Sequence, residues 1–163
     1  MEKDLVDRVT EQWARQRPEL DFKAMAVVAR LLRMSRLLDQ QLQPAFSQFN
    51  LKVGEFDVLS SLRRAGEPYT LTPTELLETM LLSSGAMTNR LDRLERAGLV
   101  TRLPDPDDRR GVLIKLTEQG LKLVNQVVEV HIANEKCLLS VLSDQEQEQL
   151  DNISRKLLAS LEK

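Results

Sequence analysis

The stretch LVTRLPDPDDRRGVLIKL, residues 99–116, decides the fold. Two strand-like runs, LVTRL and GVLIKL, lie on either side of a segment of prolines, carboxylates and arginines, PDPDDRRG. Apolar runs with β-branched residues that flank a turn-forming segment are typical of a β-hairpin. The sequence therefore predicts a stiff, charged finger anchored by two short strands.

A helix-turn-helix unit is predicted directly before this hairpin. TPTE at Thr72–Glu75 has the pattern of a capping box with proline at the first helical position. After this short helix, Ser83 or Ser84 can cap a second helix, which Gly98 is placed to end. Its inner face consists of three apolar residues, Met87, Leu91 and Leu94. A helix-turn-helix followed by a hairpin is a winged helix, in which the finger is the wing and the second helix is the recognition helix.

Helical patterns lie on both sides of this unit. LVDRVTEQW predicts a short helix before Pro18, and a long helical stretch follows over 21–49, where Pro44 either kinks or divides it. GEFDVLSSLRR predicts a short helix before Gly66. A further helix begins at Thr117, with Ile132 and Leu139 among its inner positions, and the SDQE capping box begins the last helix, whose apolar face is Leu150, Ile153, Leu157 and Leu161. The predicted fold class is mostly α with a small β-hairpin.

Length, composition and charge restrict the function classes. A chain of 163 residues with 29% charged and 42% hydrophobic residues is typical of one globular domain rather than a disordered or membrane protein. The N-terminal sequence lacks an apolar signal core, so a cytoplasmic location is expected. A single cysteine, Cys137, forbids an internal disulfide. Because the net charge is only −2, any nucleic-acid binding must depend on local charge placement.

The sequence NRLDRLERAGLVTRLPDPDDRRGVLIKLTEQG, residues 89–120, resembles the MarR family of bacterial transcriptional regulators in its recognition helix, its DRR wing and the LT that starts the next helix. A narrower resemblance is to the urate-responsive group typified by PecS and HucR. It rests on QWARQRPELD, EFDVL, TNRLDRLE and an arginine before the wing. The resemblance implies a homodimeric winged helix-turn-helix repressor that binds a palindromic operator in double-stranded DNA and is released by a ligand.

The resemblance also implies a division of the chain into functional segments. One MarR-type domain is expected over 1–163, with an extra N-terminal helix over 1–17, dimerisation helices over 21–49 and 117–163, and a DNA-binding lobe over 52–116. No cofactor is expected.

The candidate DNA-binding residues lie on the recognition helix and the wing. Short hydrogen-bonding side chains in the first turns of the helix are of the kind that read base edges, and arginines at a wing tip meet phosphate or the minor groove. The alternative is that they are capping residues and a solvated loop. Asn89 stands where the family commonly has a basic residue. The predicted set is Ser83, Ser84, Thr88, Asn89, Arg93, Asp108, Arg109 and Arg110.

Arg90 suggests a ligand site. Its spacing from Met87 and Leu94 places it on the apolar face of the recognition helix, where a charge is costly unless it is paired. One interpretation is a structural ion pair, with Asp57 as the candidate partner. The other is a site for urate or a related anionic planar heterocycle, formed by Asp57, Arg90, Arg102 and Trp13. A phenolic ligand or a response to pH is the alternative.

Other functions are less favoured by the sequence. An enzyme would need a catalytic set, and with one histidine there is no Ser/His/Asp arrangement, phosphate-binding glycine loop or metal cluster. A winged helix that binds protein remains a rival, since the fold alone does not determine function. His131 and Cys137 are too few for a structural zinc site; Cys137 is expected to be a packing residue and His131 an interface residue.

Overall fold

The computed structural model describes residues 2–80, 87–108 and 111–162. The chain forms two compact units that divide between Pro44 and Ala45. This division does not test which segments dimerise and which bind DNA, so that assignment stays a prediction. None of the described helices is long and apolar enough to cross a membrane.

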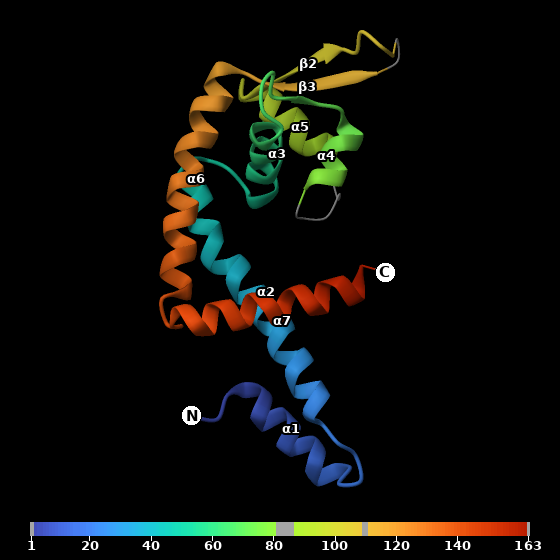
Figure 1. Ribbon diagram of the computed structural model, residues 1–163, viewed down its shortest axis with the longest axis vertical. Helices are drawn as coiled ribbons and strands as arrows, with labels where there is room; N and C mark the ends of the chain where they lie inside the picture. The colour runs from blue at the N-terminus through green and yellow to red at the C-terminus, as the bar shows by residue number, and fades with distance from the viewer. Residues whose placement is uncertain (1, 81–86, 109–110, 163) are drawn as a thin grey trace. The chain divides into compact units, whose positions relative to one another are not determined.

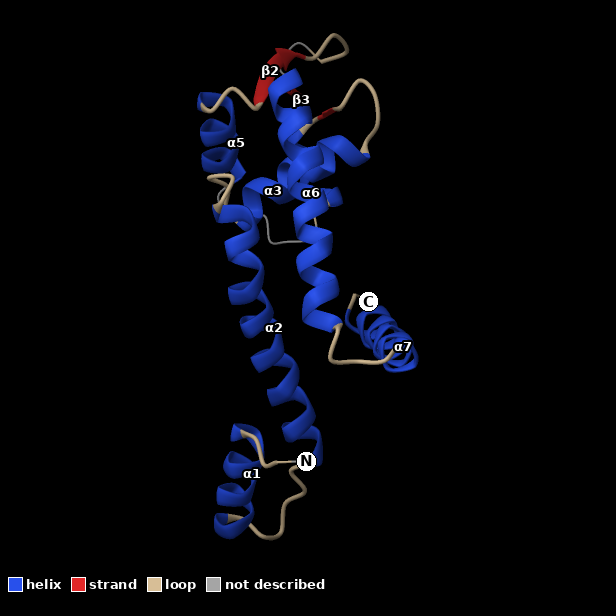
Figure 2. Cartoon of the chain, turned by 90° about the vertical axis from the view of Figure 1, so that its left-hand side faces the viewer, coloured by secondary structure: helices blue, strands red, loops and turns tan. Residues whose placement is uncertain are grey.

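The first unit is a helical hairpin. The predicted N-terminal helix is confirmed as α1, Leu5–Gln16, and it lies beside the first part of α2, Lys23–Ser47 (Figure 2). Arg30 links the start of α1 to α2: its Nε donates to Oδ2 of Asp4 at 2.8 Å. This hydrogen bond lowers the pKa of Asp4 to about 2. The helix α2 continues through Pro44, so the proline does not end it.

The second unit contains the predicted winged helix (Figure 1). Its helices are α3 (Val53–Arg64), α4 (Pro73–Thr79), α5 (Met87–Arg96), α6 (Glu118–Leu139) and α7 (Asp144–Leu161). The capping boxes predicted at Thr72 and Ser143 are confirmed, and Thr117 caps α6 as expected. Gly98 follows α5 with a φ of 69°, a conformation that favours glycine at the end of a helix.

The predicted hairpin is confirmed as β2, Val100–Pro104, and β3, Val112–Leu116, which extend past α4 and α5 in Figure 1. Arg102 pairs with Ile114 in this antiparallel ladder. A third strand that the sequence did not predict, β1 at Thr70–Leu71, pairs with β3 and makes the order β1-β3-β2. Two residues are too short a segment for any alternation to be visible.

The core of the second unit lies between α3 and the elements around it. The run from Glu55 to Leu62 in α3 is buried, polar residues included, because α4, α5, β3 and α6 all pack against this helix. The side chains with little or no exposure are Val58, Leu59, Leu62, Leu76, Leu94, Ile114, Val124 and Val127. The predicted recognition helix, which is α5, is therefore attached to this packed core.

The long helices carry apolar side chains that this single chain leaves uncovered. The helix α7 has no buried residue, and its predicted apolar face is exposed at Ile153, Leu157 and Leu161. Ile132 and Leu139 of α6 are also exposed, so the prediction that they lie inside is wrong for the single chain. Helical periodicity identifies a face that needs cover, but it does not say whether the same chain supplies the cover.

Candidate nucleic-acid interface and ligand site

The helix α5 presents two different faces. Leu91 and Leu94 are buried against the rest of the unit, as predicted, and Thr88 and Asn89 are exposed on the other side. Ser83 and Ser84, which belong to the same predicted set, lie outside the described residues. The described part of α5 thus offers short polar side chains on an exposed helical face, the arrangement that major-groove reading requires.

An ion pair joins α5 to the start of α3. Nε of Arg93 lies 2.8 Å from Oε1 of Glu55, whose side chain is only 4% exposed, while that of Arg93 is 44% exposed. The other carboxylate oxygen of Glu55 accepts from the backbone N–H of Lys52 at 2.9 Å and so caps α3. Glu55 was not among the predicted site residues; an acidic residue at the third position of a short helix is the signal that marks it.

Arg102 connects the wing to α5. Its Nη2 lies 2.6 Å from Oδ1 of Asp92, and its Nη1 pairs with Glu95. The hydrogen bond to Asp92 raises the pKa of Arg102. These contacts use the side chain that was predicted to serve as a cationic arm of the ligand site, and they attach β2 to the recognition helix.

Arg90 packs against α3. A Cβ built on Gly54 would lie 2.6 Å from Nε of Arg90, so the guanidinium occupies space that a side chain at position 54 would take. Asp57, the predicted partner, is buried and lies one helical turn beyond Gly54. Arg90 was predicted to lie on the apolar face of its helix, and its half-buried position agrees with that prediction.

The four predicted ligand residues do not all belong to one compact unit. Trp13 is in the first unit, where it stacks on Phe22 with ring centroids 6.3 Å apart. Asp92 and Glu95, the partners of Arg102, are on α5 in the second unit. Because an α-helix turns about 100° per residue, they lie on a different side of α5 from Arg90. A ligand that contacts Arg90, Arg102 and Trp13 together therefore stays a prediction.

Hydrogen bonds join the described residues of the wing tip, 105–108 and 111. The N–H of Asp107 donates to Oδ1 of Asp105 at 2.9 Å, and the N–H of Gly111 donates to the carbonyl of Asp108 at 2.8 Å. A Cβ on Gly111 would lie 2.8 Å from that of Asp105, so only glycine fits there without a shift. Asp108 is exposed. Arg109 and Arg110, the predicted wing-tip arginines, lie outside the described residues.

The end of α5, the start of β2 and the start of α6 meet closely. The N–H of Thr117 donates to the carbonyl of Leu99 at 3.1 Å, and Oγ1 of Thr117 donates to the carbonyl of Gly98 at 2.7 Å. A Cβ on Gly120 would lie only 2.0 Å from the carbonyl oxygen of Leu99. These contacts hold α6 directly to the end of α5 and the start of β2.

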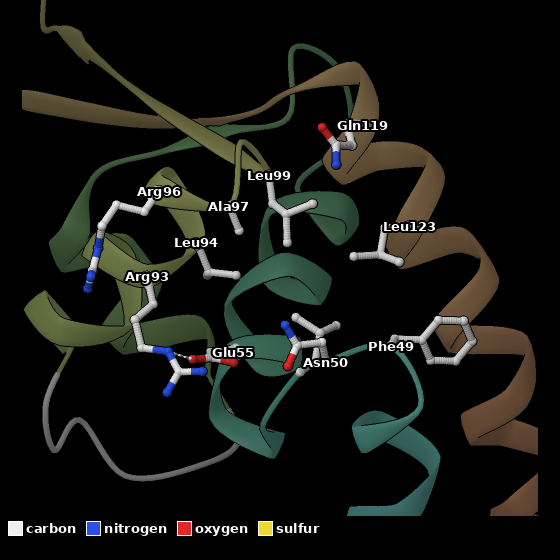
Figure 3. A pocket seen from close by; sticks show the side chains of 11 residues that line it. Phe49, Asn50, Glu55, Arg93, Leu94, Arg96, Ala97, Leu99, Gln119 and Leu123 are labelled. Carbon is white, nitrogen blue, oxygen red and sulfur yellow. Dashed lines mark ion pairs between the residues drawn. The ribbon is translucent and has the colours of Figure 1, made fainter.

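A cavity of about 510 Å³ opens beside the Arg93–Glu55 pair (Figure 3). Apolar side chains from α5, α6 and the segment before α3 form much of its wall, and arginines stand at one side. Of the predicted site residues it includes Arg93. The lining residues are Phe49, Asn50, Leu51, Glu55, Arg93, Leu94, Arg96, Ala97, Leu99, Gln119 and Leu123.

His131 sits in an aromatic cluster in the second unit. Its ring lies 5.0 Å from that of Phe46 and 5.1 Å from that of Phe56, and Nε2 is 3.2 Å from Oε1 of Glu135. Cys137 is exposed, so the expectation that it is a packing residue is wrong for the single chain. Among the described residues, no group of three or more His, Cys, Asp and Glu is arranged to hold a metal ion.

Comparison with known proteins places this geometry in a family of regulators. A model described as "MarR family" matches residues 49–111. The chain is 42% identical to the HTH-type transcriptional regulator PecS of Dickeya dadantii over 97% of this chain and 93% of that protein. It is also 35% identical to the multiple antibiotic resistance protein MarR of Escherichia coli over 86% of this chain and 90% of that protein.

Solved structures of MarR-family regulators resemble this fold. A cysteine-to-serine mutant of E. coli MarR complexed with operator DNA matches with a TM-score of 0.73 and 33% identity, covering 84% of this chain and 97% of that one. AbsC, a MarR family regulator of Streptomyces coelicolor, matches with a TM-score of 0.77 and 25% identity over 88% of this chain and 97% of that one. These relatives are transcriptional regulators and not enzymes.

Proposed function

We infer that this chain, which belongs to the MarR family and is a DNA-binding transcriptional regulator, is a homodimeric repressor of a palindromic operator. A small anionic aromatic ligand is proposed to release it from the DNA. The observation that carries the proposal is the 42% identity to the regulator PecS along nearly the whole chain. The exposed polar face of α5 and the wing beside it support the same function.

The uncovered helices support the dimer. A single chain that exposes apolar stripes on α2, α6 and α7 carries more apolar surface than monomeric proteins usually do. A second copy can cover these stripes through the symmetric contact that most homodimers use. Two recognition helices related by a twofold axis then match two inverted half-sites in DNA.

Footprinting is expected to show two protected half-sites about one helical turn apart, because each copy places one α5 in a major groove. The measurement is nuclease protection of promoter fragments together with the stoichiometry of the complex. Protection of one half-site by a monomer would contradict the proposed arrangement. A DNA affinity that does not change with salt would contradict DNA binding itself, since release of counterions from phosphates demands a steep slope.

Asn89→Ala is expected to reduce discrimination among operator variants more than affinity for unrelated DNA. The reason is that Asn89 is exposed on α5, where an amide can make paired hydrogen bonds to a base edge. A loss of about 1–3 kcal/mol in discrimination at the contacted base pair is expected. Binding to single-base operator variants measures it, and an equal loss on every sequence would instead assign Asn89 to the phosphate backbone.

The proposed ligand is urate or a related anionic planar heterocycle. Guanidinium groups such as that of Arg90 match its charge and planar oxygen edges, and an indole such as that of Trp13 stacks on a flat ring. Trp13 is the only tryptophan, so titration with urate is expected to quench the fluorescence if the ring binds there. Trp13→Phe is expected to weaken ligand binding while leaving DNA affinity unchanged.

The alternative effectors have distinct outcomes. If millimolar urate and related purines change neither the Trp13 fluorescence nor the operator complex, the purine assignment fails. Release by salicylate or another phenolic compound would then favour a phenolic ligand. Release by a change of pH without ligand would direct attention to His131 in its aromatic cluster.

A further inference from the structure

We propose that Glu55 is a positioning residue for DNA binding: it holds the Arg93 guanidinium through Nε so that the two Nη groups face a backbone phosphate. The inference rests on the proposed function, because it requires α5 to lie in the major groove. It adds an acidic residue on a different helix to the DNA-binding machinery.

The burial of Glu55 requires a partner for each of its oxygens. A carboxylate that is 4% exposed is costly unless it is hydrogen-bonded and paired. Oε2 accepts from the Lys52 N–H at the start of α3, where the helix dipole also favours a negative charge, and Oε1 contacts Nε of Arg93. Glu55 therefore stands on a rigid support and determines where the Arg93 side chain lies.

The outer part of Arg93 is available for a second partner. Its side chain is 44% exposed, and among the described residues its ion pair is with Glu55 through Nε. Figure 3 shows the Arg93 guanidinium beside Glu55, with the ion pair between them. A guanidinium held at Nε still presents its two Nη groups, which suit the oxygens of a phosphate.

The place of Arg93 on α5 fits a phosphate better than a base. At about 100° per residue, Arg93 lies between the inner side marked by Leu94 and the exposed side marked by Asn89. When Asn89 meets the floor of the groove, a residue on this flank meets its wall, where the backbone phosphates lie. Arg93 would therefore strengthen binding to any DNA sequence rather than select one.

Two possible roles of the Glu55 carboxylate predict opposite changes in DNA affinity when its charge is removed. An unpaired carboxylate near DNA repels phosphate, so its neutralisation alone would tighten binding. If Glu55 instead holds Arg93 in place, its neutralisation weakens binding, because a mobile arginine must lose its rotamer freedom when it contacts the phosphate. The direction in which Glu55→Gln changes DNA affinity therefore distinguishes a positioning role from simple charge repulsion.

The experiment is a double-mutant cycle with Glu55→Gln, Arg93→Met and the double variant. The affinity of each intact dimer for a fluorescent mixed-sequence duplex of about 30 base pairs, a length that can accommodate both recognition helices, is measured by anisotropy at several salt concentrations. Arg93→Met is expected to weaken binding about tenfold and to lower the salt slope by about 0.9 for each phosphate that the variant no longer neutralises. Glu55→Gln is expected to weaken binding several-fold, and the double variant no further than Arg93→Met.

Two further variants separate positioning from folding. Glu75→Gln is the matched control, because Glu75 has the same place in the capping box of α4, with Oε2 2.7 Å from the Thr72 N–H. It is expected to leave DNA affinity unchanged. Arg93→Lys leaves Glu55 in place and keeps the positive charge, but an ammonium cannot hold the carboxylate and the phosphate in one planar fork. It is expected to weaken binding almost as much as Arg93→Met.

The outcomes are distinct. Tighter or equal binding by Glu55→Gln, or a weakening that persists in the Arg93→Met background, would overturn the positioning role. If Glu55→Gln does not fold, wild-type affinity in Arg93→Lys would overturn it instead. Absence of salt-dependent binding by the wild-type dimer would overturn the proposed function as well, so the two failures are distinguishable.

Discussion

Gly120→Ala is expected to destabilise the second unit by about 3 kcal/mol, because the new methyl group would overlap the backbone beside it. Its carbon would lie 2.0 Å from the carbonyl oxygen of Leu99 and 3.2 Å from Cδ2 of Leu116. The oxygen belongs to the chain that leads into β2 and cannot rotate away as a flexible side chain does. The start of α6 must therefore move.

That movement would break further hydrogen bonds. The Thr117 N–H donates to the same Leu99 oxygen at 3.1 Å, and Oγ1 of Thr117 accepts from the Gly120 N–H at 3.0 Å to cap α6. The gain of about 1 kcal/mol from alanine's higher helix propensity does not offset these losses. Thermal unfolding followed by circular dichroism is expected to show a decrease of roughly 6–12 °C in Tm for a chain of this size.

Gly66→Ala is the control for this substitution. Gly66 has a φ of 79°, so alanine there is strained by about 1–2 kcal/mol, but no atom lies within 4 Å of its Cβ position. The loss of stability at position 66 is therefore expected to be smaller than that at position 120. An equal or larger loss in Gly66→Ala would show that close approach of α6 to Leu99 is not the reason that position 120 needs glycine.

Arg90→Ala is expected to abolish release of DNA by urate while leaving a folded, DNA-binding dimer. The proposed ligand binds partly through this guanidinium, which is carried by the recognition helix itself, so its capture can displace α5 from the DNA. Couplings between two sites are commonly about 5- to 150-fold in affinity, and this coupling is expected to disappear. Anisotropy of an operator complex titrated with urate measures it.

Gly54→Ala is the matched companion of that variant. The added Cβ would lie 2.6 Å from Nε of Arg90, so it pushes the guanidinium from its place without changing its charge. We expect it to alter the urate midpoint in the same direction as Arg90→Ala. If urate releases the Arg90→Ala variant from the operator with the wild-type midpoint, Arg90 is not part of the ligand site, whatever the effect of Gly54→Ala.

Apart from β1, the local elements of this protein could be predicted from the sequence alone. The capping residues Thr72, Thr117 and Ser143, the glycine at 98 and the two apolar runs of the wing act over a few neighbouring residues, so their physical effects are visible in the order of side chains. The helix-turn-helix and the hairpin follow from them, and so does the exposed polar face of α5. The family resemblance at residues 89–120 is confirmed by the similarity to MarR-family regulators.

Only the tertiary structure decided which charged groups meet. Glu55 and Arg93 are 38 residues apart in the printed sequence, and Arg102 lies on a different element from Asp92 and Glu95. Ion pairs of this kind depend on side-chain direction and on the few ångströms between packed elements, which periodicity does not specify. The two-residue strand β1 and the contact of Gly120 with Leu99 also depend on how packed elements meet. The exposure of Ile132 has a related reason: whether an apolar face is covered depends on the surfaces that surround it and not on its own spacing.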